Sequence, residues 1–338
     1  MTSSNQQSRA FGIEKTIGID GLIESVVPVP APGPGEVLVH VHASSLNYRD
    51  VIILEGHYYM PIPSGRIPLS DGAGEIAAVG PCVTRFKVGD RVTNAFCPDW
   101  IDGPYATNYS QYSGDVDGWL ADHRVVTAES LVHLPDGLTF EEAATLPCAG
   151  VTAWSALKDL QPGQTVVTLG AGGVSLFAIQ LAKAMGARVI ATTSSSAKAK
   201  QLKALGADDT IDYKSEPNWS QQVRQLTNGK GADRIVEVGG PGTFEQSVKS
   251  VAVGGQVSMV GAVAGMEGSI EFMTLFMSQA RYQPISVGSR QDLEDMLRFI
   301  AMHNIHPRID SEYEFDDAKL AFQRLMTRNV FGKVVIRH

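Results

Sequence analysis

A run of glycines between an apolar strand and an amphipathic helix constrains this chain more than any other feature. Residues 165–169 form a short apolar run, and residues 174–185 place their apolar side chains at helical spacing. Between them, small residues leave backbone N–H groups open at a helix N-terminus, which suits the pyrophosphate of a dinucleotide. The usual third glycine is replaced by Ser175. We predict cofactor contacts at Gly170, Gly172, Gly173 and Val174.

The same stretch of chain alternates between strand and helix patterns. Further strands are predicted at residues 188–192, 234–238 and 256–260, and a second helix at residues 197–205. This alternation is typical of a parallel sheet with helices on both faces. The sequence therefore predicts an α/β fold with a doubly wound Rossmann sheet.

The second predicted strand ends in hydroxyl side chains where an NAD-binding protein usually carries an acidic residue. Thr193 and Ser194 occupy that place, and Lys198 follows. Because this place holds no carboxylate that would repel a 2′-phosphate, the three residues favour NADPH. NADH stays possible. The alternative is that the serines only cap the next helix and that Lys198 is a solvated surface charge.

The first third of the chain has the pattern of a β-rich domain. Residues 36–42 alternate as a half-buried strand, and residues 75–80 and 86–92 predict two strands joined by a turn. Residues 96–118 show no period, so we expect a surface excursion or a flap over a site. Capping boxes predict helices after Thr139 and Ser289, the second with buried positions Leu293, Met296, Leu297 and Ile300.

Composition excludes several classes of protein. A length of 338 residues favours two domains, and a net charge of −8 argues against a nucleic-acid partner. The longest charge-free stretches are interrupted by glycines and polar residues, so no membrane span is expected. Three cysteines are too few for a disulfide framework. With a polar N-terminus, this composition favours a cytoplasmic protein.

Several motifs occur in an order that is more specific than any one of them. They lie at residues 68–75, 88–92, 146–154 and 205–208, with the glycine run between the last two. Together they resemble the medium-chain dehydrogenase/reductase superfamily. The resemblance implies a mostly β, chaperonin-10-like catalytic domain around a Rossmann domain. The expected boundaries are residues 1–150 for the first part of the catalytic domain, 151–286 for the Rossmann domain and 287–338 for the completion of the catalytic domain.

The resemblance also locates the residues that would bind a catalytic zinc. Zinc-dependent members use Cys, His and Cys at positions that here hold Asn47, Ser70 and Cys148. The cysteines of a structural zinc lobe are absent as well. One thiol among three positions does not make a zinc site, which normally has three protein ligands, so we expect no metal and read Cys148 as a small buried residue. The remaining resemblance is to zinc-independent quinone oxidoreductases, enone reductases and a branch named alcohol dehydrogenase by homology.

Without a Lewis acid, negative charge that develops on a substrate oxygen needs hydrogen-bond donors or a proton source. We therefore predict an enzyme that reduces quinones or the activated C=C bond of α,β-unsaturated carbonyls. Asn47 would donate to the oxygen, and Tyr48 or Tyr59 would act as acid, although each tyrosine alternatively packs in a pocket wall. Two other functions stay open: a zinc-independent alcohol dehydrogenase or carbonyl reductase, and a dinucleotide-binding sensor or structural protein with little turnover.

The resemblance implies further contacts with the cofactor and a partner. A closed homodimer is the default assembly for such enzymes. The expected cofactor contacts outside the glycine run are Thr152, Gly239, Gly261, Val287 and Gly288.

Overall fold

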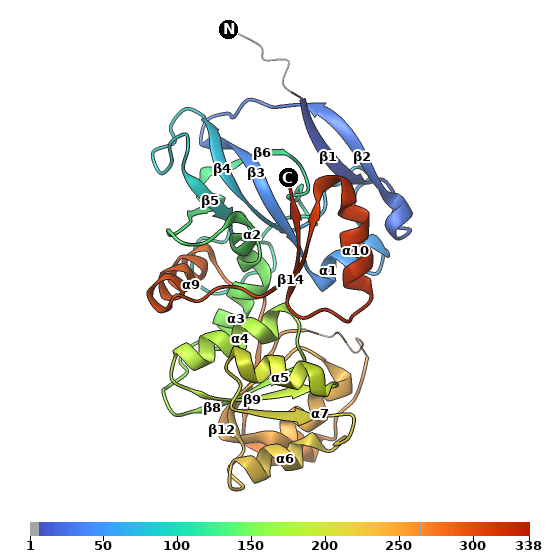
Figure 1. Cartoon of the computed structure of the whole chain (residues 1–338), viewed down its shortest axis with the longest axis vertical. Helices are drawn as coiled ribbons and strands as arrows, with labels where there is room; N and C mark the ends of the chain where they lie inside the picture. The colour runs from blue at the N-terminus through green and yellow to red at the C-terminus, as the bar shows by residue number, and fades with distance from the viewer. Residues whose placement is uncertain (1–6, 262, 264, 266) are drawn as a thin grey trace. The chain divides into compact units, whose positions relative to one another are not determined.

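The computed structural model describes residues 7–261, 263, 265 and 267–338 of the chain (Figure 1). It divides into two compact units. Unit 1 comprises Met1–Val151 and Gly288–His338, and unit 2 comprises Thr152–Val287. Helix α3 (Val151–Ala156) begins at the boundary between them. Within the described part of the chain, no helix has both the length and the apolar character needed to span a bilayer.

Unit 2 is built on a six-stranded sheet in which every neighbouring pair is parallel. Its strands are β8 (Thr165–Leu169), β9 (Arg188–Thr193), β10 (Asp209–Asp212), β11 (Ala232–Glu237), β12 (Val251–Met259) and β13 (Arg281–Pro284). They lie in the order β10-β9-β8-β11-β12-β13. Counted from the first strand of the unit, this is the order 3-2-1-4-5-6 of Rossmann domains. The predicted doubly wound α/β sheet is therefore confirmed.

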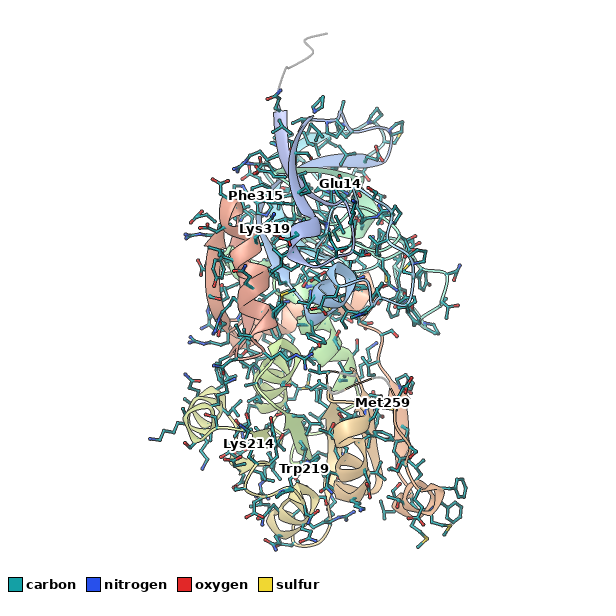
Figure 2. The ribbon with its side chains drawn as sticks, turned by 90° about the vertical axis from the view of Figure 1, so that its right-hand side faces the viewer. Glu14, Lys214, Trp219, Met259, Phe315 and Lys319 are labelled. Atoms are coloured by element: carbon teal, nitrogen blue, oxygen red, sulfur yellow. The ribbon has the colours of Figure 1, made fainter. Side chains whose placement is uncertain are left out.

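Helices connect the strands of unit 2, as parallel pairing requires. They are α4 (Gly173–Ala184), α5 (Ser196–Leu205), α6 (Trp219–Leu226), α7 (Pro241–Ser250) and α8 (Phe272–Ser278). The strands contribute buried aliphatic side chains, such as Val167 and Ile235, to one hydrophobic cluster. Trp219 packs into this cluster from α6 (Figure 2). Burial of this apolar surface provides the main driving force for the unit's stability.

Unit 1 contains a seven-stranded sheet and a two-stranded ribbon, and only its β14–β15 pair is parallel among the strand pairs described. The main sheet has the order β14-β15-β3-β4-β5-β7, with β6 paired to β3. Strands β14 and β15 come from the C-terminal stretch but lie in one sheet with strands from the first 133 residues. The strands are β1 (Gln7–Ile13), β2 (Leu22–Pro28), β3 (Glu36–Leu46), β4 (Asp71–Val79), β5 (Arg91–Asn94), β6 (His123–Thr127), β7 (Leu131–His133), β14 (Ile309–Glu314) and β15 (Lys333–Arg337).

The helices of unit 1 are short except for one near the C-terminus. They are α1 (Tyr48–Leu54), α2 (Phe140–Ala143), α9 (Arg290–His303) and α10 (Ala318–Met326). Short 3₁₀ turns lie at Ile19–Gly21, Ala128–Ser130 and Phe315–Asp317, and a π-helical turn lies at Leu146–Gly150. Phe315 (labelled in Figure 2) leads into α10. The centroid of its ring lies 5.2 Å from that of Phe11. The C-terminal segment therefore contributes to the core of this unit as well as to its sheet.

Both predicted capping boxes are present. Thr139 Oγ1 accepts from the backbone N–H of Glu142, and Glu142 returns a carboxylate to the backbone N–H of Thr139. Ser289 and Asp292 make the same reciprocal pair at the start of α9. The four apolar positions predicted for this helix, Leu293, Met296, Leu297 and Ile300, are all buried. Each reciprocal pair satisfies two N–H groups that a helix start leaves open.

The strand predicted at residues 86–92 is wrong over most of its length. Strand β5 begins only at Arg91. Before it, Asp90 accepts a hydrogen bond from the backbone N–H of Lys87, and Gly89 has a φ of +89°. These residues form a tight turn, because a side-chain acceptor and a left-handed glycine close the chain back on itself. The apolar alternation over residues 86–92 therefore predicted a strand, but the side-chain hydrogen bond of Asp90 and the left-handed Gly89 form a turn there instead.

The aperiodic segment at residues 96–118 is held by its aromatic side chains. The buried Trp100 stacks on Tyr109 with ring centroids 5.6 Å apart. Tyr112 is buried as well, and it lies edge-on to Trp119. Aromatic residues that pack inward in this way fix a long irregular segment in place.

Candidate functional site

The glycine run follows β8 and opens α4, at the carboxyl end of the strand where the order of the sheet reverses. Gly172 is the N-cap of the helix, and no side-chain hydrogen bond caps it. A Cβ atom built on Gly170 or Gly172 would meet no other heavy atom within 4 Å, and Gly170 has a φ of +74°. The loop therefore presents open backbone at a helix N-terminus, as a bound pyrophosphate requires.

Ser175 explains why this run can lack the usual third glycine. Its hydroxyl donates to the carbonyl oxygen of Leu169 at 2.6 Å, and the side chain is buried. The first turn of α4 is thus tied to the last residue of β8. A small side chain that forms this bond permits the close packing of helix and strand that glycine normally allows.

At the end of β9, the structure shows a helix cap and leaves the cofactor interpretation of the hydroxyl residues untested. The Ser195 hydroxyl accepts from the backbone N–H of Lys198 and caps α5, as the alternative expects. Thr193 is buried, and its hydroxyl lies 3.3 Å from the backbone nitrogen of Ser195. Ser194 and Lys198 are half-buried. The assignment of Thr193, Ser194 and Lys198 to a 2′-phosphate stays a prediction.

A buried carboxylate organises the glycines after β11. Glu237 Oε1 accepts from the backbone N–H groups of Gly239 and Gly240 at 2.7 and 3.0 Å and from the Thr243 hydroxyl at 2.6 Å. Gly261 donates to the backbone carbonyl of Glu237 at 3.3 Å, so both predicted glycines lie beside the end of one strand.

The remaining predicted cofactor residues lie near the ends of unit 2. Thr152 is the first residue of unit 2, and its side chain is buried. Val287 is the last residue of the unit and has a φ of +49°, a conformation that is unusual for a β-branched side chain. Gly288 is the residue at which the chain re-enters unit 1. Contacts of these three residues with a cofactor stay predictions.

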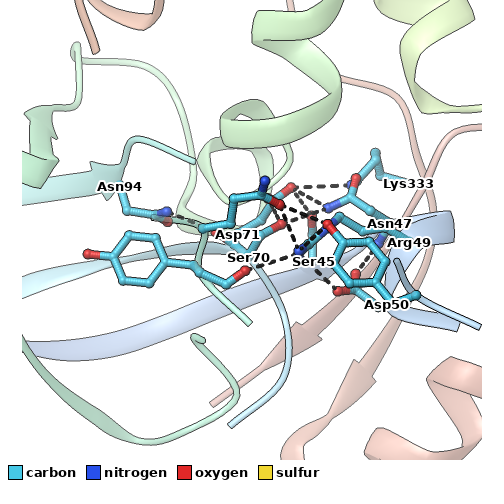
Figure 3. A network of polar contacts seen from close by, with 11 residues as sticks. Ser45, Asn47, Arg49, Asp50, Ser70, Asp71, Asn94 and Lys333 are labelled. Atoms are coloured by element: carbon cyan, nitrogen blue, oxygen red, sulfur yellow. Dashed lines mark hydrogen bonds and ion pairs between the residues drawn. The ribbon is translucent and has the colours of Figure 1, made fainter. Parts of the chain in front are cut away.

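A second set of candidate residues forms a hydrogen-bonded cluster in unit 1 (Figure 3). Strand β3 pairs with β4 on one side and with β15 on the other, with Ser45 opposite Asp71 and Leu46 opposite Val334. These pairings bring the end of β3 next to the starts of β4 and β15. The polar cluster, as we call it, consists of Ser45, Asn47, Arg49, Asp50, Ser70, Asp71, Asn94 and Lys333.

Asn47 is held at both ends of its side-chain amide. Its nitrogen Nδ2 donates to Asp71 Oδ2 at 2.9 Å, and its oxygen Oδ1 accepts from Lys333 Nζ at 2.6 Å. Asp71 is fully buried, and it also accepts from the hydroxyls of Ser70 and Ser45 at 2.7 and 3.3 Å. Lys333 Nζ lies 3.5 Å from Asp71 Oδ2. The amide therefore has one orientation that its neighbours support.

Asn47 also begins α1, together with the acid three residues on. Asp50 Oδ2 accepts from the backbone N–H of Asn47 at 2.7 Å. Burial raises the pKa of Asp50 to about 6, although the Arg49 guanidinium, 3.9 Å from its other oxygen, favours the charged form. Asp50 therefore caps the start of α1 and forms an ion pair with Arg49.

The candidate tyrosines have partners of their own. Gln111 accepts from the Tyr58 hydroxyl at 2.8 Å and donates to the Tyr59 hydroxyl at 2.8 Å, while Arg49 donates to the Tyr58 oxygen at 3.1 Å. Burial raises the pKa of Tyr58 to about 12, and Tyr59 is 74% exposed. Tyr48 accepts from the Arg328 guanidinium. The structure thus joins Tyr59 to Arg49 through Gln111 and Tyr58, whereas Tyr48 lies in a separate contact.

The three positions compared with zinc ligands do not match the requirements of that ion. Burial raises the pKa of the Cys148 thiol, and the nearby Asp71 carboxylate adds to this effect, so a thiolate is disfavoured. The Asn47 amide oxygen is already bonded to an ammonium group. Among the residues described, no cluster of three or more His, Cys, Asp and Glu side chains has the arrangement of a metal site.

Sequence reasoning missed the residues that hold Asn47 in place. Asp71 lies in the motif at residues 68–75, and Lys333 is the first residue of β15, yet neither was assigned a role. Glu237 and Gln111 were missed in the same way. The available signal was a lysine that opens an otherwise apolar strand, which is an unusual position for a residue that is rarely buried without a partner.

Two family models match this chain. One is described as a zinc-binding dehydrogenase and matches residues 173–302. The other is described as an alcohol dehydrogenase GroES-like domain and matches residues 33–136. The first lies mostly in unit 2, whereas the second lies in the β-rich first part of unit 1.

Relatives align along most of the chain. A zinc-type alcohol dehydrogenase-like protein of Schizosaccharomyces pombe is 42% identical over 313 residues, which cover 89% of this chain and 90% of that protein. A quinone oxidoreductase of Pseudomonas aeruginosa is 35% identical over 313 residues, 88% and 90% of the respective chains. A mycobacterial protein solved in complex with NADPH is 30% identical, with a TM-score of 0.82 and coverage of 98% and 100%.

The chain belongs to the medium-chain dehydrogenase/reductase superfamily, as its motifs predict. It is an oxidoreductase of that family.

Proposed function

We propose that this protein is a zinc-independent reductase that prefers NADPH and reduces quinones or the activated C=C bond of α,β-unsaturated carbonyls. One observation carries the proposal. The position that is compared with a zinc ligand holds Asn47, whose amide is oriented by Lys333 and Asp71. An amide N–H at this place can stabilise a developing enolate or hydroquinone oxyanion without a metal.

The two units would have different roles, one in binding the cofactor and the other in binding the substrate. Unit 2 would bind the dinucleotide, with pyrophosphate on the open N–H groups of residues 170–174 and a 2′-phosphate near Thr193, Ser194 and Lys198. Unit 1 would hold the substrate oxygen. We propose domain boundaries at residues 150/151 and 286/287, each one residue before the corresponding end of a compact unit. The NADPH bound by the mycobacterial relative supports the choice of cofactor.

A reduced nicotinamide would supply hydride when bound, and the chain's own residues would stabilise the negative charge on the substrate and deliver a proton. Asn47 donates to the substrate oxygen as negative charge develops there. Tyr58 is unsuited to release a proton near neutral pH, because burial raises its pKa to about 12. The exposed Tyr59, joined to Tyr58 through Gln111, is the better placed phenol, and Tyr48 is the second candidate.

Reduction of saturated carbonyls, or oxidation of alcohols, without zinc is the second candidate function. It is favoured by the alcohol dehydrogenase-like name of the Schizosaccharomyces pombe relative. The polar cluster would then stabilise an alkoxide, which is more basic than an enolate and needs a stronger electrostatic partner. A sensor or structural protein with little turnover is the third candidate.

A second copy of this chain is the partner that we propose for unit 2. Strand β13 lies at the edge of its sheet, with hydrogen-bonding groups on the side away from β12. Helix α8 leads to this edge and carries Phe272 and Phe276, which are 71% and 55% exposed. Aromatic side chains beside an open edge suit a symmetric interface. A homodimer in the cytoplasm, where reduced cysteines persist, completes the proposal.

NADPH absorbance at 340 nm, followed with metal-stripped protein, tests the function. We expect turnover of quinones or enones, slower turnover of the matching saturated aldehydes, and a lower rate with NADH. Activity on saturated aldehydes alone would favour the second candidate. Activity that appears only after zinc is added would contradict zinc independence. Tight NADPH binding without oxidation by any of these electrophiles would favour the third candidate.

A further inference from the structure

We propose that the ammonium group of Lys333 is the resident cation of the polar cluster: it excludes a metal ion there and holds the Asn47 amide in its working orientation. Lys333 is therefore a positioning residue, since it acts through Asn47. The exclusion of metal stands on the cluster alone, whereas the catalytic consequence rests on the proposed function.

Burial makes the charge of Lys333 significant. Its side chain is 4% exposed, and Asp71, the carboxylate with which it pairs, is fully buried. A buried ammonium needs both a counter-charge and hydrogen-bond acceptors to offset its lost hydration. Asp71 supplies the charge at 3.5 Å, and Asn47 Oδ1 supplies the shorter bond at 2.6 Å. The cluster therefore depends on Asn47 as the chief acceptor for this cation.

The charges of the cluster already balance. Lys333 and Arg49 carry two positive charges, and Asp71 and Asp50, when ionised, carry two negative charges. A divalent cation beside Asn47 would add two positive charges within reach of the ammonium, in surroundings that screen them weakly. It would also have to displace Lys333 from the amide oxygen. The ammonium thus occupies the electrostatic place that a metal would need.

The same contacts select one rotamer of the amide. If the Asn47 amide turned over, its oxygen would face the Asp71 carboxylate and its NH₂ group would face the Lys333 ammonium. Both contacts would be repulsive. In the observed orientation, Asn47 Nδ2 donates to Asp71 at 2.9 Å, and its second N–H has, among the residues that the structure describes, the longer contact of 3.4 Å with the Ser70 hydroxyl. That second N–H is the donor available to a substrate oxygen.

Lys333 also strengthens this donor. A cation bonded to the amide oxygen draws electron density from the amide, and linked hydrogen bonds of this kind reinforce one another. The second N–H therefore meets a developing oxyanion as a better donor than an ordinary asparagine. A charge that acts in this way stabilises the transition state more than it stabilises the bound substrate.

A metal-binding experiment tests the exclusion without reference to activity. The double variant Asn47→Cys/Ser70→His supplies, with Cys148, the three ligand types of a zinc site. The double variant is equilibrated with zinc chloride, the excess is removed, and the zinc content is measured by mass spectrometry. While Lys333 is present, we expect the double variant to retain almost no zinc. Adding Lys333→Ala to the double variant should give about one zinc per chain. Equal zinc content with and without Lys333 would overturn the exclusion.

A kinetic experiment tests the positioning role. Lys333→Met should lower kcat with the best electrophile about 100-fold, the order found when one oxyanion donor is lost, and change the KM for NADPH less than about twofold. Lys333→Arg keeps the charge and should recover at least about tenfold of that loss. Lys15→Met removes an exposed lysine of the same unit and should have the activity of the unmodified protein.

Because Lys333→Met leaves the buried Asp71 carboxylate without its paired cation, Lys333→Met/Asp71→Asn provides a neutral variant that keeps an acceptor for Asn47. A kcat near that of the unmodified protein in either variant would overturn the positioning role. If none of the electrophiles tested supports NADPH oxidation by the unmodified protein, the proposed function would fail, and so would the positioning role. The zinc contents would still decide the exclusion of metal.

Discussion

The glycine run of unit 2 and the polar cluster of unit 1 are built in opposite ways. The run consists of six consecutive residues, Gly170 to Ser175, and works through backbone groups at one helix start. The cluster works through side chains drawn from five segments, and its central contact joins Asn47 to a lysine 286 residues further along the chain. A backbone site can be recognised in a linear pattern, whereas a side-chain cluster exists only after the sheet has formed.

Asn47→Ala removes the central amide of the polar cluster and should have the largest effect on activity among the proposed variants. Without the amide, a substrate oxygen loses its donor and Lys333 loses its shortest hydrogen bond. We expect kcat/KM for the electrophile to fall about 100- to 1,000-fold, or ~3–4 kcal/mol. Steady-state kinetics measure this, and NADPH affinity by fluorescence titration serves as the control. Unchanged kcat/KM would show that the oxyanion is stabilised elsewhere.

Gly172→Val alters the glycine run of unit 2, which works through backbone groups, and leaves the polar cluster unchanged. A Cβ atom at this position meets no other heavy atom within 4 Å, so the melting temperature should stay within about 2 °C, but the side chain would occupy the place proposed for a pyrophosphate. We expect the Kd for NADPH to rise roughly 50-fold, which is ~2.3 kcal/mol.

Gly170→Ala is the informative companion of that variant. It places a Cβ on a residue with a φ of +74° and should lower the free energy of unfolding by about 1 kcal/mol. Calorimetry and NADPH titration of both variants separate strain from blocked binding. Unchanged NADPH affinity in Gly172→Val would remove the run from the cofactor site.

Asp50→Asn sharpens the account of charge in the cluster. Because the pKa of Asp50 is raised to about 6 in the folded protein, the folded state binds its proton more tightly than the unfolded state does. Its contribution to the free energy of unfolding therefore falls as pH rises from about 4 to about 6, by on the order of 3 kcal/mol, and is constant above that range. The asparagine has no such dependence.

Urea denaturation of both proteins from pH 4 to pH 8 measures the effect of Asp50. The stability of the natural protein relative to Asp50→Asn should decline between pH 4 and pH 6 and then level off. A difference that is constant across the whole range would mean that Asp50 has an ordinary pKa in the folded state.

Ser194→Asp should have the smallest effect, on cofactor preference alone. A carboxylate at the end of β9 repels a 2′-phosphate and can accept from the ribose hydroxyls of NADH. We expect the ratio of kcat/KM for NADPH to that for NADH to fall about tenfold, equivalent to ~1.4 kcal/mol. Ser196→Asp, at an exposed position of α5, is the matched control. An unchanged ratio would remove Ser194 from the proposed 2′-phosphate site.

Local patterns predicted the elements that local forces decide. The capping box at Ser289 and the apolar stripe of α9 were predicted residue by residue, because caps and helical spacing act within one or two turns. The strand at residues 86–92 was predicted wrongly for the same reason. Two contacts of Asp90 with Lys87 and a left-handed Gly89 closed a turn that alternation alone did not indicate.

The cluster shows the limit of that reasoning. Asn47 was singled out, but Lys333 and Asp71 were not, because antiparallel pairing of β15 and β4 with β3 brings them together. The sequence by itself determined the parallel sheet, the glycine run and the absence of the usual zinc ligand types, since each depends on residue type and short spacing. Only the tertiary structure decided which cation meets Asn47, because burial removes water and leaves the ammonium to be satisfied by whatever the sheet places beside it.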